Sequence, residues 1–450
     1  MSQSMRTPLL FAFVAVLFIL EGTTGAWIFS GSWNTALGIL NMALISAIMA
    51  LGVNLQWGFA GLFNVGIMGF VALGGLAAVL ISMPPTTEAW AAGGIRVILG
   101  LSLGAATVTA AILVQLRMAA GRARTLTTIA ILIGGFFIYR AVFDGGVAAV
   151  EAVDAAGTGY LGGLNFGGAN YKDWGFMTLI SWPVGGLLAA GVAWLIGKTA
   201  LGLRSDYLAI ATLGISEIII AVMKNEDWLS RGVKNVIGLP RPVPYEIDLQ
   251  ESAGFVERTA ALGLDPVTSS SIVVKLGYAG LFSIVLVIVL ILAQLALASP
   301  WGRMMRAIRD NEDAAEAMGK NVTARHLQIF ILGSAICGVA GAMMTTLDSQ
   351  LTPSSYQPLR FTFLVWVMVI VGGSGNNFGS VLGGFLIFFL WVQVEPMGAI
   401  LMQIMTSGMA EDNVLRLHLL ESVAHMRLLT MGLILILVLR FAPKGLIPEK

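Results

Sequence analysis

The sequence predicts an all-α integral membrane protein that crosses the bilayer about ten to twelve times. Three observations predict this class. Of the 450 residues, 57% are hydrophobic and 11% are charged, and the mean hydropathy is +0.85. Soluble domains carry about 25% charged residues. The apolar residues also gather in long runs, and a run that crosses lipid has to satisfy its own backbone groups as a helix.

The apolar runs are the predicted spans, since a hydrocarbon core takes roughly 20 helical residues. The runs lie at 8–29, 37–57, 62–82, 95–116, 125–143, 180–197, 207–223, 277–298, 327–347, 361–372, 381–397 and 427–441. The first could be a cleaved signal peptide, but the many later runs favour an uncleaved span. Glycine interrupts several runs, so broken or re-entrant segments are expected. No soluble domain is evident, and residues 1–450 are predicted to form a single transmembrane domain.

Positive charge predicts the orientation. The loop 117–124 carries three arginines and no acid, which places it in the cytoplasm. Counting spans from this loop puts segment 299–325 on the cytoplasmic side. The same count puts segment 224–276 outside, together with the acidic connection 144–179.

Segment 299–325, SPWGRMMRAIRDNEDAAEAMGKNVTAR, is a charged island between two apolar runs, and we call it the coupling segment. Arginines at 303, 306 and 309 predict a short helix with one basic face. Asn311 as N-cap and Gly319 as the C′ residue predict a second helix, 312–318. Two turns are too short to be stable alone, so this helix needs a surface to dock on, and another subunit is favoured. A loop that only sets topology is the alternative.

Several segments resemble known permeases. The sequence AAEAMG before an apolar run resembles the coupling loop of ABC importer permeases. Five further segments resemble branched-chain amino acid permeases, and the resemblance covers most of 52–448. They are the glycine-rich 51–80, LRSDYLAIATLGISEIII (203–220), GVKNVIGLPRP (232–242), VGGSGNNFGSVLGG (371–384) and FAPKGLIP (441–448). Ile67 and Leu76 depart from that family, which often has histidine and tyrosine there.

Polar side chains inside apolar runs are costly in lipid unless they face a neighbouring helix or a wet pathway. We predict a translocation route, with interhelical hydrogen bonding and a structural acid as the alternatives. Its residues are Asn54, Gln56, Gly58, Gly61, Asn64, Gly66 and Glu217. The resemblance implies ATPase-coupling residues and a lip that faces a binding protein. The coupling residues are Arg306, Asp310, Ala314, Ala315, Glu316, Ala317, Met318 and Gly319, and the lip residues are Gly238, Pro240, Arg241 and Pro242. Ser334, Gly338 and Ala342 recur every fourth residue, which predicts a close helix contact.

Enzyme motifs are weak in this chain. The run 191–199, GVAWLIGKT, has five residues between its glycines where a Walker A loop has four. The three histidines are scattered, and Cys337 lies in an apolar run as a small buried thiol. No catalytic or metal site is expected, and a net charge of +1 gives no electrostatic reason to bind nucleic acid.

The resemblance implies the permease subunit of an ATP-driven ABC importer in the bacterial inner membrane. The cargo would be branched-chain or other small amino acids, delivered by an extracytoplasmic binding protein. The other partners would be an ABC ATPase, which binds the ATP, and a second, non-identical permease; the chain itself would hold no cofactor. One alternative is an ABC permease for urea or short amides. Another is an ion-coupled secondary transporter in which Glu217 carries protons.

Overall fold

The computed structural model describes residues 3–26, 28–153, 159–165, 175–410 and 413–449. Among them, ten helices are long and apolar enough to cross a membrane, and two shorter apolar helices, Ile67–Ser82 and Phe361–Gly372, accompany them. The predicted all-α polytopic fold is therefore confirmed. Parts of the predicted outer connection, 154–158 and 166–174, lie outside the described residues.

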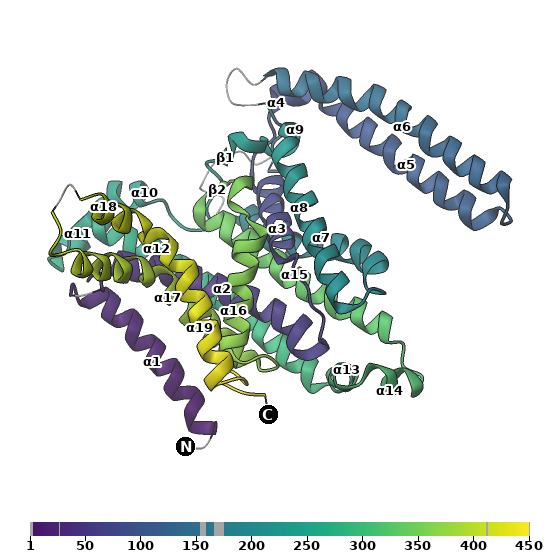
Figure 1. Ribbon diagram of the computed structural model, residues 1–450. Helices are drawn as coiled ribbons and strands as arrows, with labels where there is room; N and C mark the ends of the chain where they lie inside the picture. Colours follow the sequence, from purple (N-terminus) through teal and green to yellow (C-terminus); the bar gives the residue numbers. More distant parts are fainter. Residues whose placement is uncertain (1–2, 27, 154–158, 166–174, 411–412, 450) are drawn as a thin grey trace.

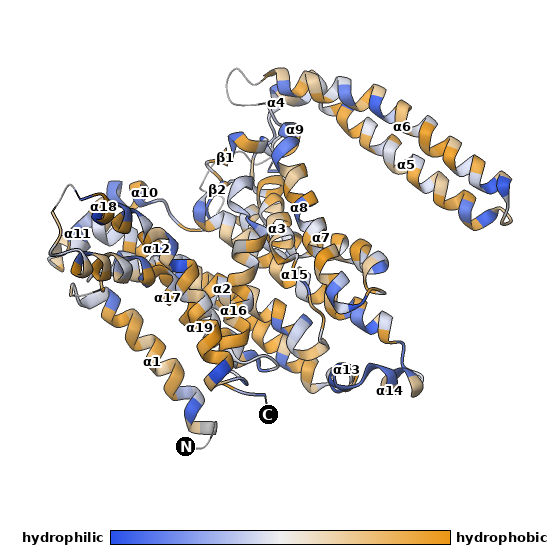
Figure 2. Ribbon diagram, in the orientation of Figure 1, coloured by the Kyte–Doolittle hydropathy of each residue, from blue (hydrophilic) through white to orange (hydrophobic). Residues whose placement is uncertain are grey.

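Hydrophobic residues make up most of each long helix (Figures 1 and 2). These helices are α1 (Gln3–Thr23), α2 (Trp33–Ala60), α3 (Ile67–Ser82), α5 (Ile95–Arg117), α6 (Arg122–Glu151), α7 (Phe176–Ala200), α8 (Ser205–Asn225), α12 (Pro266–Ala298), α15 (Val322–Asp348), α16 (Pro358–Gly372), α17 (Asn377–Met405) and α19 (Met426–Phe441).

Short elements join these helices. They are α4 (Thr87–Ala89), the π-helical turn η1 (Trp90–Gly94), α9 (Asp227–Ser230), η4 (Gly232–Lys234), α10 (Glu246–Glu251), α11 (Ala253–Ala261), α13 (Pro300–Asp310), α14 (Glu312–Ala317), η5 (Pro353–Ser355), α18 (Val414–Glu421) and η6 (Ser422–His425). Two short strands, β1 (Val236–Ile237) and β2 (Gln350–Leu351), pair antiparallel with Val236 opposite Leu351.

The centre of the bundle is α2, which packs against α12, α15, α16 and α17. In its most apolar window 83% of the residues are buried, against 22% in α12. α3 packs against α7, α15 and α8. Because these central helices are surrounded by protein, polar side chains on them have neighbours to bond.

Glycine sets the closest helix contact, where α3, α7 and α15 meet. A Cβ on Gly74 of α3 would lie 1.8 Å from the carbonyl oxygen of Gly338 on α15. A Cβ on Gly338 would lie 2.5 Å from the carbonyl oxygen of Gly185 on α7. The predicted close contact is therefore confirmed for Gly338 and Ala342, which both lie at this junction. Ser334, the third residue of the prediction, instead accepts a hydrogen bond from Gln56 of α2.

Helix α12 begins eleven residues earlier than the apolar run predicted, at Pro266 rather than 277. Asp265 caps it by accepting a hydrogen bond from the backbone N–H of Thr268 at 2.8 Å, and Pro266 occupies the first turn. The polar first turns therefore extend the helix beyond its apolar run, and part of the predicted loop 224–276 is helical.

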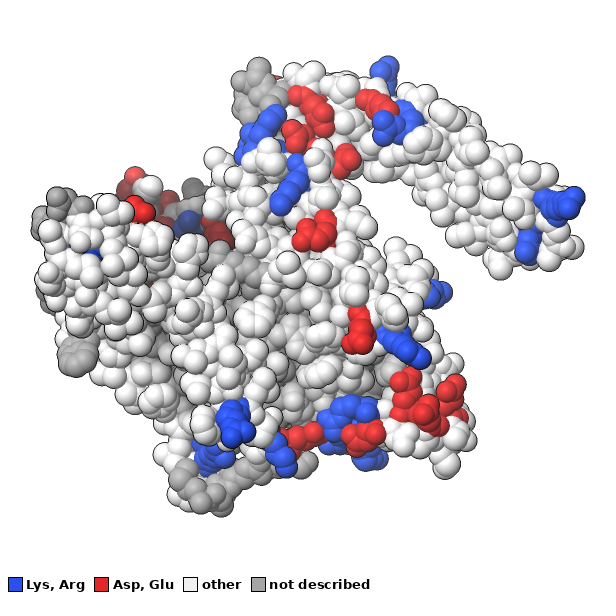
Figure 3. Space-filling model, viewed as in Figure 1, with Lys and Arg blue, Asp and Glu red and all other residues white. Residues whose placement is uncertain are grey.

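A hairpin of α5 and α6 projects away from the body (Figure 1). The two helices pack on each other and meet η1, α4 and α9 at their base. There the rings of Phe143 and Trp228 stack edge-to-face with centroids 5.6 Å apart. The arginine loop 117–124 forms the tip, where Figure 3 shows basic side chains.

The connecting elements gather at two opposite ends of the bundle (Figure 1). Both marked chain ends lie with α13 and α14 at one end, and β1, β2, α9 and α10 lie at the other. The predicted inner segment 299–325 and most of the predicted outer segment 224–276 are thus separated by the length of the helices. Which end faces the cytoplasm stays a prediction from the arginine loop.

Thiol labelling checks this orientation. In a Cys337→Ala background, Ser252→Cys should react with a membrane-impermeant maleimide in intact cells, and Thr323→Cys should react only after the membrane is opened. Both native side chains are exposed, so accessibility is set by the side of the membrane. Reversed labelling would place the coupling segment outside and would contradict the orientation.

Candidate functional site

Three amide side chains, Asn54, Gln56 and Asn64, are buried at the centre of the bundle, and we call them the amide cluster. Their exposed fractions are 0, 1 and 0%. Gln56 and Asn64 bond each other, whereas Asn54 bonds Gly375 and Asn377. Asn64 Nδ2 donates to Gln56 Oε1 at 2.9 Å. Gln56 Nε2 in turn donates to the carbonyl of Phe330 at 2.9 Å and to Ser334 Oγ at 3.1 Å, both on α15. In this conformation the amide cluster joins helices, as the alternative interpretation expected.

The predicted broken helix is found between α2 and α3. α2 ends at Ala60 and is capped by Gly61, whose φ of 71° suits glycine, and α3 starts at Ile67 against the side of α8. The N–H of Val65 donates to Thr212 Oγ1 on α8 at 3.1 Å. A Cβ on Gly66 would lie 2.3 Å from the Thr212 carbonyl oxygen, so glycine is needed for this approach.

Glu217 lies apart from the other predicted route residues. Six of the seven belong to α2 and the turn that follows it, whereas Glu217 is on the exposed outer face of α8. Its carboxylate makes no hydrogen bond or ion pair with any residue that the structure describes. That the seven line one route stays a prediction. Polar side chains occur on both faces of α8, with Thr212 and Ser216 buried and Tyr207 exposed, so its sequence gave no signal for the direction of Glu217.

The coupling segment folds as two helices, α13 and α14, and α14 is capped at both ends. Asn311 Oδ1 accepts from the backbone N–H of Ala314 at 2.9 Å, and Gly319 closes α14 with a φ of 75°. The N–H of Gly319 donates to the Glu316 carbonyl at 2.8 Å, and that of Lys320 donates to the Ala315 carbonyl at 3.1 Å. Both predicted caps are confirmed, and α14 ends at Ala317, one residue before the predicted end.

Helix α14 exposes most of its surface. Ala315 packs against the hydrophobic core, while Ala314, Glu316, Ala317 and Met318 are exposed. Ala314, Ala317 and Met318 lie at i, i+3 and i+4, so they share one face. Met318 is 79% exposed. A two-turn helix with an apolar outward face is a ready surface for another protein.

The basic face of α13 points back at the bundle. Arg303 Nη1 donates to the Ala298 carbonyl at 3.1 Å, and Arg306 Nη2 donates to that of Leu297 at 3.4 Å, so both bind the end of α12. Arg309 Nη1 reaches the Gly58 carbonyl in the last turn of α2. Final helix carbonyls lack intrahelical partners and favour a cation. The arginine periodicity predicted the face, but no local pattern indicated these partners.

The predicted lip lies at the other end, on the segment after β1. Arg241 fixes it, because its Nε donates to Ser349 Oγ at 2.7 Å and its Nη1 pairs with Glu246 Oε2 at 2.9 Å. The Pro240 carbonyl accepts from Thr178 Oγ1 at 3.1 Å. Of the four predicted lip residues, Gly238 is exposed, while Pro240, Arg241 and Pro242 are half-buried. Ile237, which the sequence did not single out, is 64% exposed beside them.

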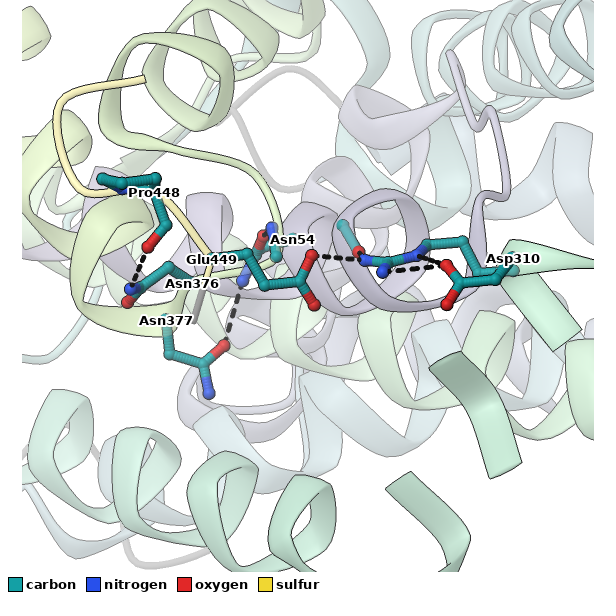
Figure 4. A network of polar contacts seen from close by, with 9 residues as sticks. Asn54, Asp310, Asn376, Asn377, Pro448 and Glu449 are labelled. Carbon is teal, nitrogen blue, oxygen red and sulfur yellow. Dashed lines mark hydrogen bonds and ion pairs between the residues drawn. The ribbon is translucent and has the colours of Figure 1, made fainter. Parts of the chain in front are cut away.

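The sequence analysis also missed a polar cluster at the α13 end (Figure 4). Asn54 Nδ2 donates to Asn377 Oδ1 at 2.9 Å, and Asn54 Oδ1 accepts from the N–H of Gly375 at 2.9 Å. Arg309 and Asp310 pair with an N···O distance of 3.0 Å. The resemblance covered the segments of these residues, but it gave no pairing between them.

The described residues offer no metal site, and the one cysteine is buried. Among the described residues, no group of three or more His, Cys, Asp or Glu side chains could hold a metal ion. Cys337 is fully buried, with its sulfur 3.9 Å from the carbonyl oxygen of Met49. Cys337 packs between α15 and α2 as a small apolar residue would.

Comparison with known proteins identifies the family. The family model described as branched-chain amino acid transport system, permease component, matches residues 155–439. The high-affinity branched-chain amino acid transport system permease protein LivM of Escherichia coli K12 is 30% identical over 223 residues, which are 48% of this chain and 51% of the relative. The probable branched-chain amino acid transport permease protein LivM of Methanocaldococcus jannaschii is 25% identical over 248 residues, 55% of this chain and 61% of the relative.

A more distant relative is the fructose import permease protein FrcC of Rhizobium meliloti, 26% identical over 102 residues, 22% of this chain and 28% of the relative. The chain spans about half the length of the LivM relatives it matches. No solved structure matches it. The matched region runs from before α7 almost to the end of α19 and includes the coupling segment, α8 and the lip. The chain is therefore a multi-pass inner-membrane protein of the branched-chain amino acid transport permease family.

Proposed function

We propose that this chain is the permease subunit of an ATP-driven ABC importer for branched-chain or other small amino acids. The observation that carries the proposal is α14, a capped helix whose exposed face consists of Ala314, Ala317 and Met318. It is suited to a groove on an ATPase subunit, with Glu316 as a charged neighbour. ATP would be bound by that subunit.

The support for mechanical coupling is the attachment of α13. Its arginines bind the carbonyl ends of α12 and α2, so α13 cannot move without these two helices. Closure of the ATPase pair on ATP would then bias the bundle between outward-open and inward-open packings. The exposed residues Ile237 and Gly238 at the opposite end would meet the binding protein that delivers the amino acid.

The exposed position of Glu217 supports the proposal of a second permease subunit. The outer face of α8 exposes Tyr207, Ile210, Gly214 and Glu217, and an added Cβ at Gly214 would find nothing within 4 Å. An acid facing lipid is costly, so this face is expected to meet a polar surface of a partner, and the translocation route would run between the two subunits. A proton-carrying acid of a lone secondary transporter would lie inside its own bundle, so the exposure of Glu217 favours the importer.

Purification of the tagged chain from its native host tests the proposal. We expect an ABC ATPase and a second, non-identical permease to copurify with it. The complex, reconstituted in vesicles with the binding protein, should take up radiolabelled leucine only when ATP is hydrolysed. A chain that purifies alone and transports with an ion gradient would refute the proposal. Uptake of urea or acetamide in place of leucine would correct the substrate.

A further inference from the structure

Residues 442–449 fold back onto the turn between α16 and α17, and we call them the clasp segment. The N–H of Leu446 donates to the Val371 carbonyl at 2.8 Å, and that of Ile447 donates to the Gly372 carbonyl at 2.9 Å. These are backbone bonds to the last carbonyls of α16, which lack intrahelical partners, so the clasp segment caps the end of this helix. Ile447, which is 3% exposed, packs into a small apolar cluster beneath it.

Glycines on both sides make this contact possible. An added Cβ on Gly445, whose φ is 75°, would lie 2.3 Å from the Cα of Gly373. An added Cβ on Gly373 would lie 2.2 Å from the Ile447 carbonyl oxygen. Asn376 Nδ2 completes the contact by donating to the Pro448 carbonyl at 3.1 Å. The two backbones therefore touch directly, and a movement of one is passed to the other.

Arg309 joins this contact to the coupling segment. Its Nη1 pairs with Glu449 Oε2 at 2.9 Å and also reaches the Gly58 carbonyl of α2. The side chains of Arg309 and Glu449 are only 24 and 29% exposed, so water screens this pair less than a surface pair. Burial lowers the pKa of Arg309, but Glu449 and Asp310 outweigh it and the net pKa is raised. The guanidinium of Arg309 is therefore charged throughout the physiological range.

Helix α2 also bonds the turn between α16 and α17. The turn between α16 and α17 donates the N–H of Gly375 to Asn54 Oδ1, and an added Cβ on Gly375 would lie 2.8 Å from Glu449 Oε2. α13, the last turns of α2, the α16–α17 turn and the clasp segment thus meet around one guanidinium (Figure 4). A cavity of about 560 Å³ borders them, lined in part by Arg306, Arg309 and Glu449.

We propose that the Arg309–Glu449 pair and the clasp segment transmit the motion of α13 to α16 and α17, so that Arg309 is a positioning residue for transport. This rests on the proposed function. Without the pair, α13 would still hold α12 through Arg303 and Arg306, and α14 would still present its docking face. ATP hydrolysis would continue, but α16 and α17 would no longer follow it.

The test uses the reconstituted complex, with phosphate release and radiolabelled leucine uptake measured in the same vesicles. Arg309→Gln and Glu449→Gln should keep the ATPase bound and keep hydrolysis, while leucine taken up per ATP falls about tenfold, the usual size of a coupling between sites. Arg309→Lys, which keeps the charge but reaches fewer acceptors, should fall between them and the wild type. Lys444→Gln, a charge loss at an exposed residue of the same segment, is the matched control and should couple normally.

Two results would overturn the proposal. If both Gln variants keep the wild-type leucine uptake per ATP, the clasp segment does not transmit the motion of α13 to α16 and α17. Loss of the ATPase from both variants would make Arg309 a docking residue instead. Failure of the wild-type chain to bind any ATPase is a different result, since it refutes the proposed function before any variant is made.

Discussion

Replacing Gly74 by valine should prevent the protein from folding. The first added carbon would lie 1.8 Å from the Gly338 carbonyl oxygen and 2.9 Å from the backbone nitrogen of Ala342. Both are backbone atoms of α15, so no side chain can rotate away. Ordinary overpacking costs about 1 to 3 kcal/mol, and a backbone contact this short forces α3 and α15 apart, so the cost should exceed that range. We expect membrane-inserted Gly74→Val to aggregate in mild detergent.

Gly280→Val is the matched control. Gly280 lies on α12, another membrane helix, and an added Cβ there would meet nothing within 4 Å. The same chemical change should therefore leave the yield of monodisperse protein and its thermal midpoint close to wild type. A Gly74→Val protein as stable as Gly280→Val would show that the contact of α3, α7 and α15 is looser than described.

Replacing Gly319 by valine should strongly reduce uptake while leaving the membrane bundle intact. The φ of 75° disfavours a β-branched residue by about 1 to 3 kcal/mol. Nothing lies within 4 Å of an added Cβ, so the effect is one of backbone conformation alone. The turn that closes α14 would change, and a helix of six residues has little else to hold it. We expect ATPase association and leucine uptake to fall at least about tenfold at normal membrane levels.

Gly254→Val is the control for this change, because Gly254 has equally open surroundings within helix α11. Glu316→Lys offers a second variant that reverses a charge on the exposed face of α14 and leaves the backbone unaltered. If both Gly319→Val and Glu316→Lys transport normally, the coupling segment only sets topology. The ion-coupled alternative would then gain weight.

The features that sequence reasoning predicted well are local. Asn311 and Gly319 cap α14 through atoms within a few residues of each, so residue type and spacing were sufficient. The spans followed from apolar runs for the same reason. At the start of α12 the apolar run was an incomplete guide, because Asp265 and Pro266 extend the helix with polar residues.

The features that it missed depend on distant partners. Asn54 bonds Asn377, which is 323 residues away in the chain, and Arg309 bonds Glu449, 140 residues away. No periodicity or spacing indicates such pairs. The free-energy cost of placing a polar side chain in lipid correctly indicated that Asn54 needs a polar environment. It could not indicate whether that environment is a water-filled pathway or a neighbouring amide.

The ties between α2 and α12 have a mechanical consequence. The two helices run in the same direction, and α13 holds both at their carbonyl ends. Near their other ends Lys275 of α12 donates to the Asn34 carbonyl at 2.9 Å and accepts from Asn41 Nδ2 at 3.0 Å, both on α2. α2 and α12, about 40 and 50 Å long at 1.5 Å per residue, are thus parallel helices connected near both ends. A push on α13 loads them along their axes, the stiffest direction of a helix, and it reaches the opposite face of the membrane without bending either one.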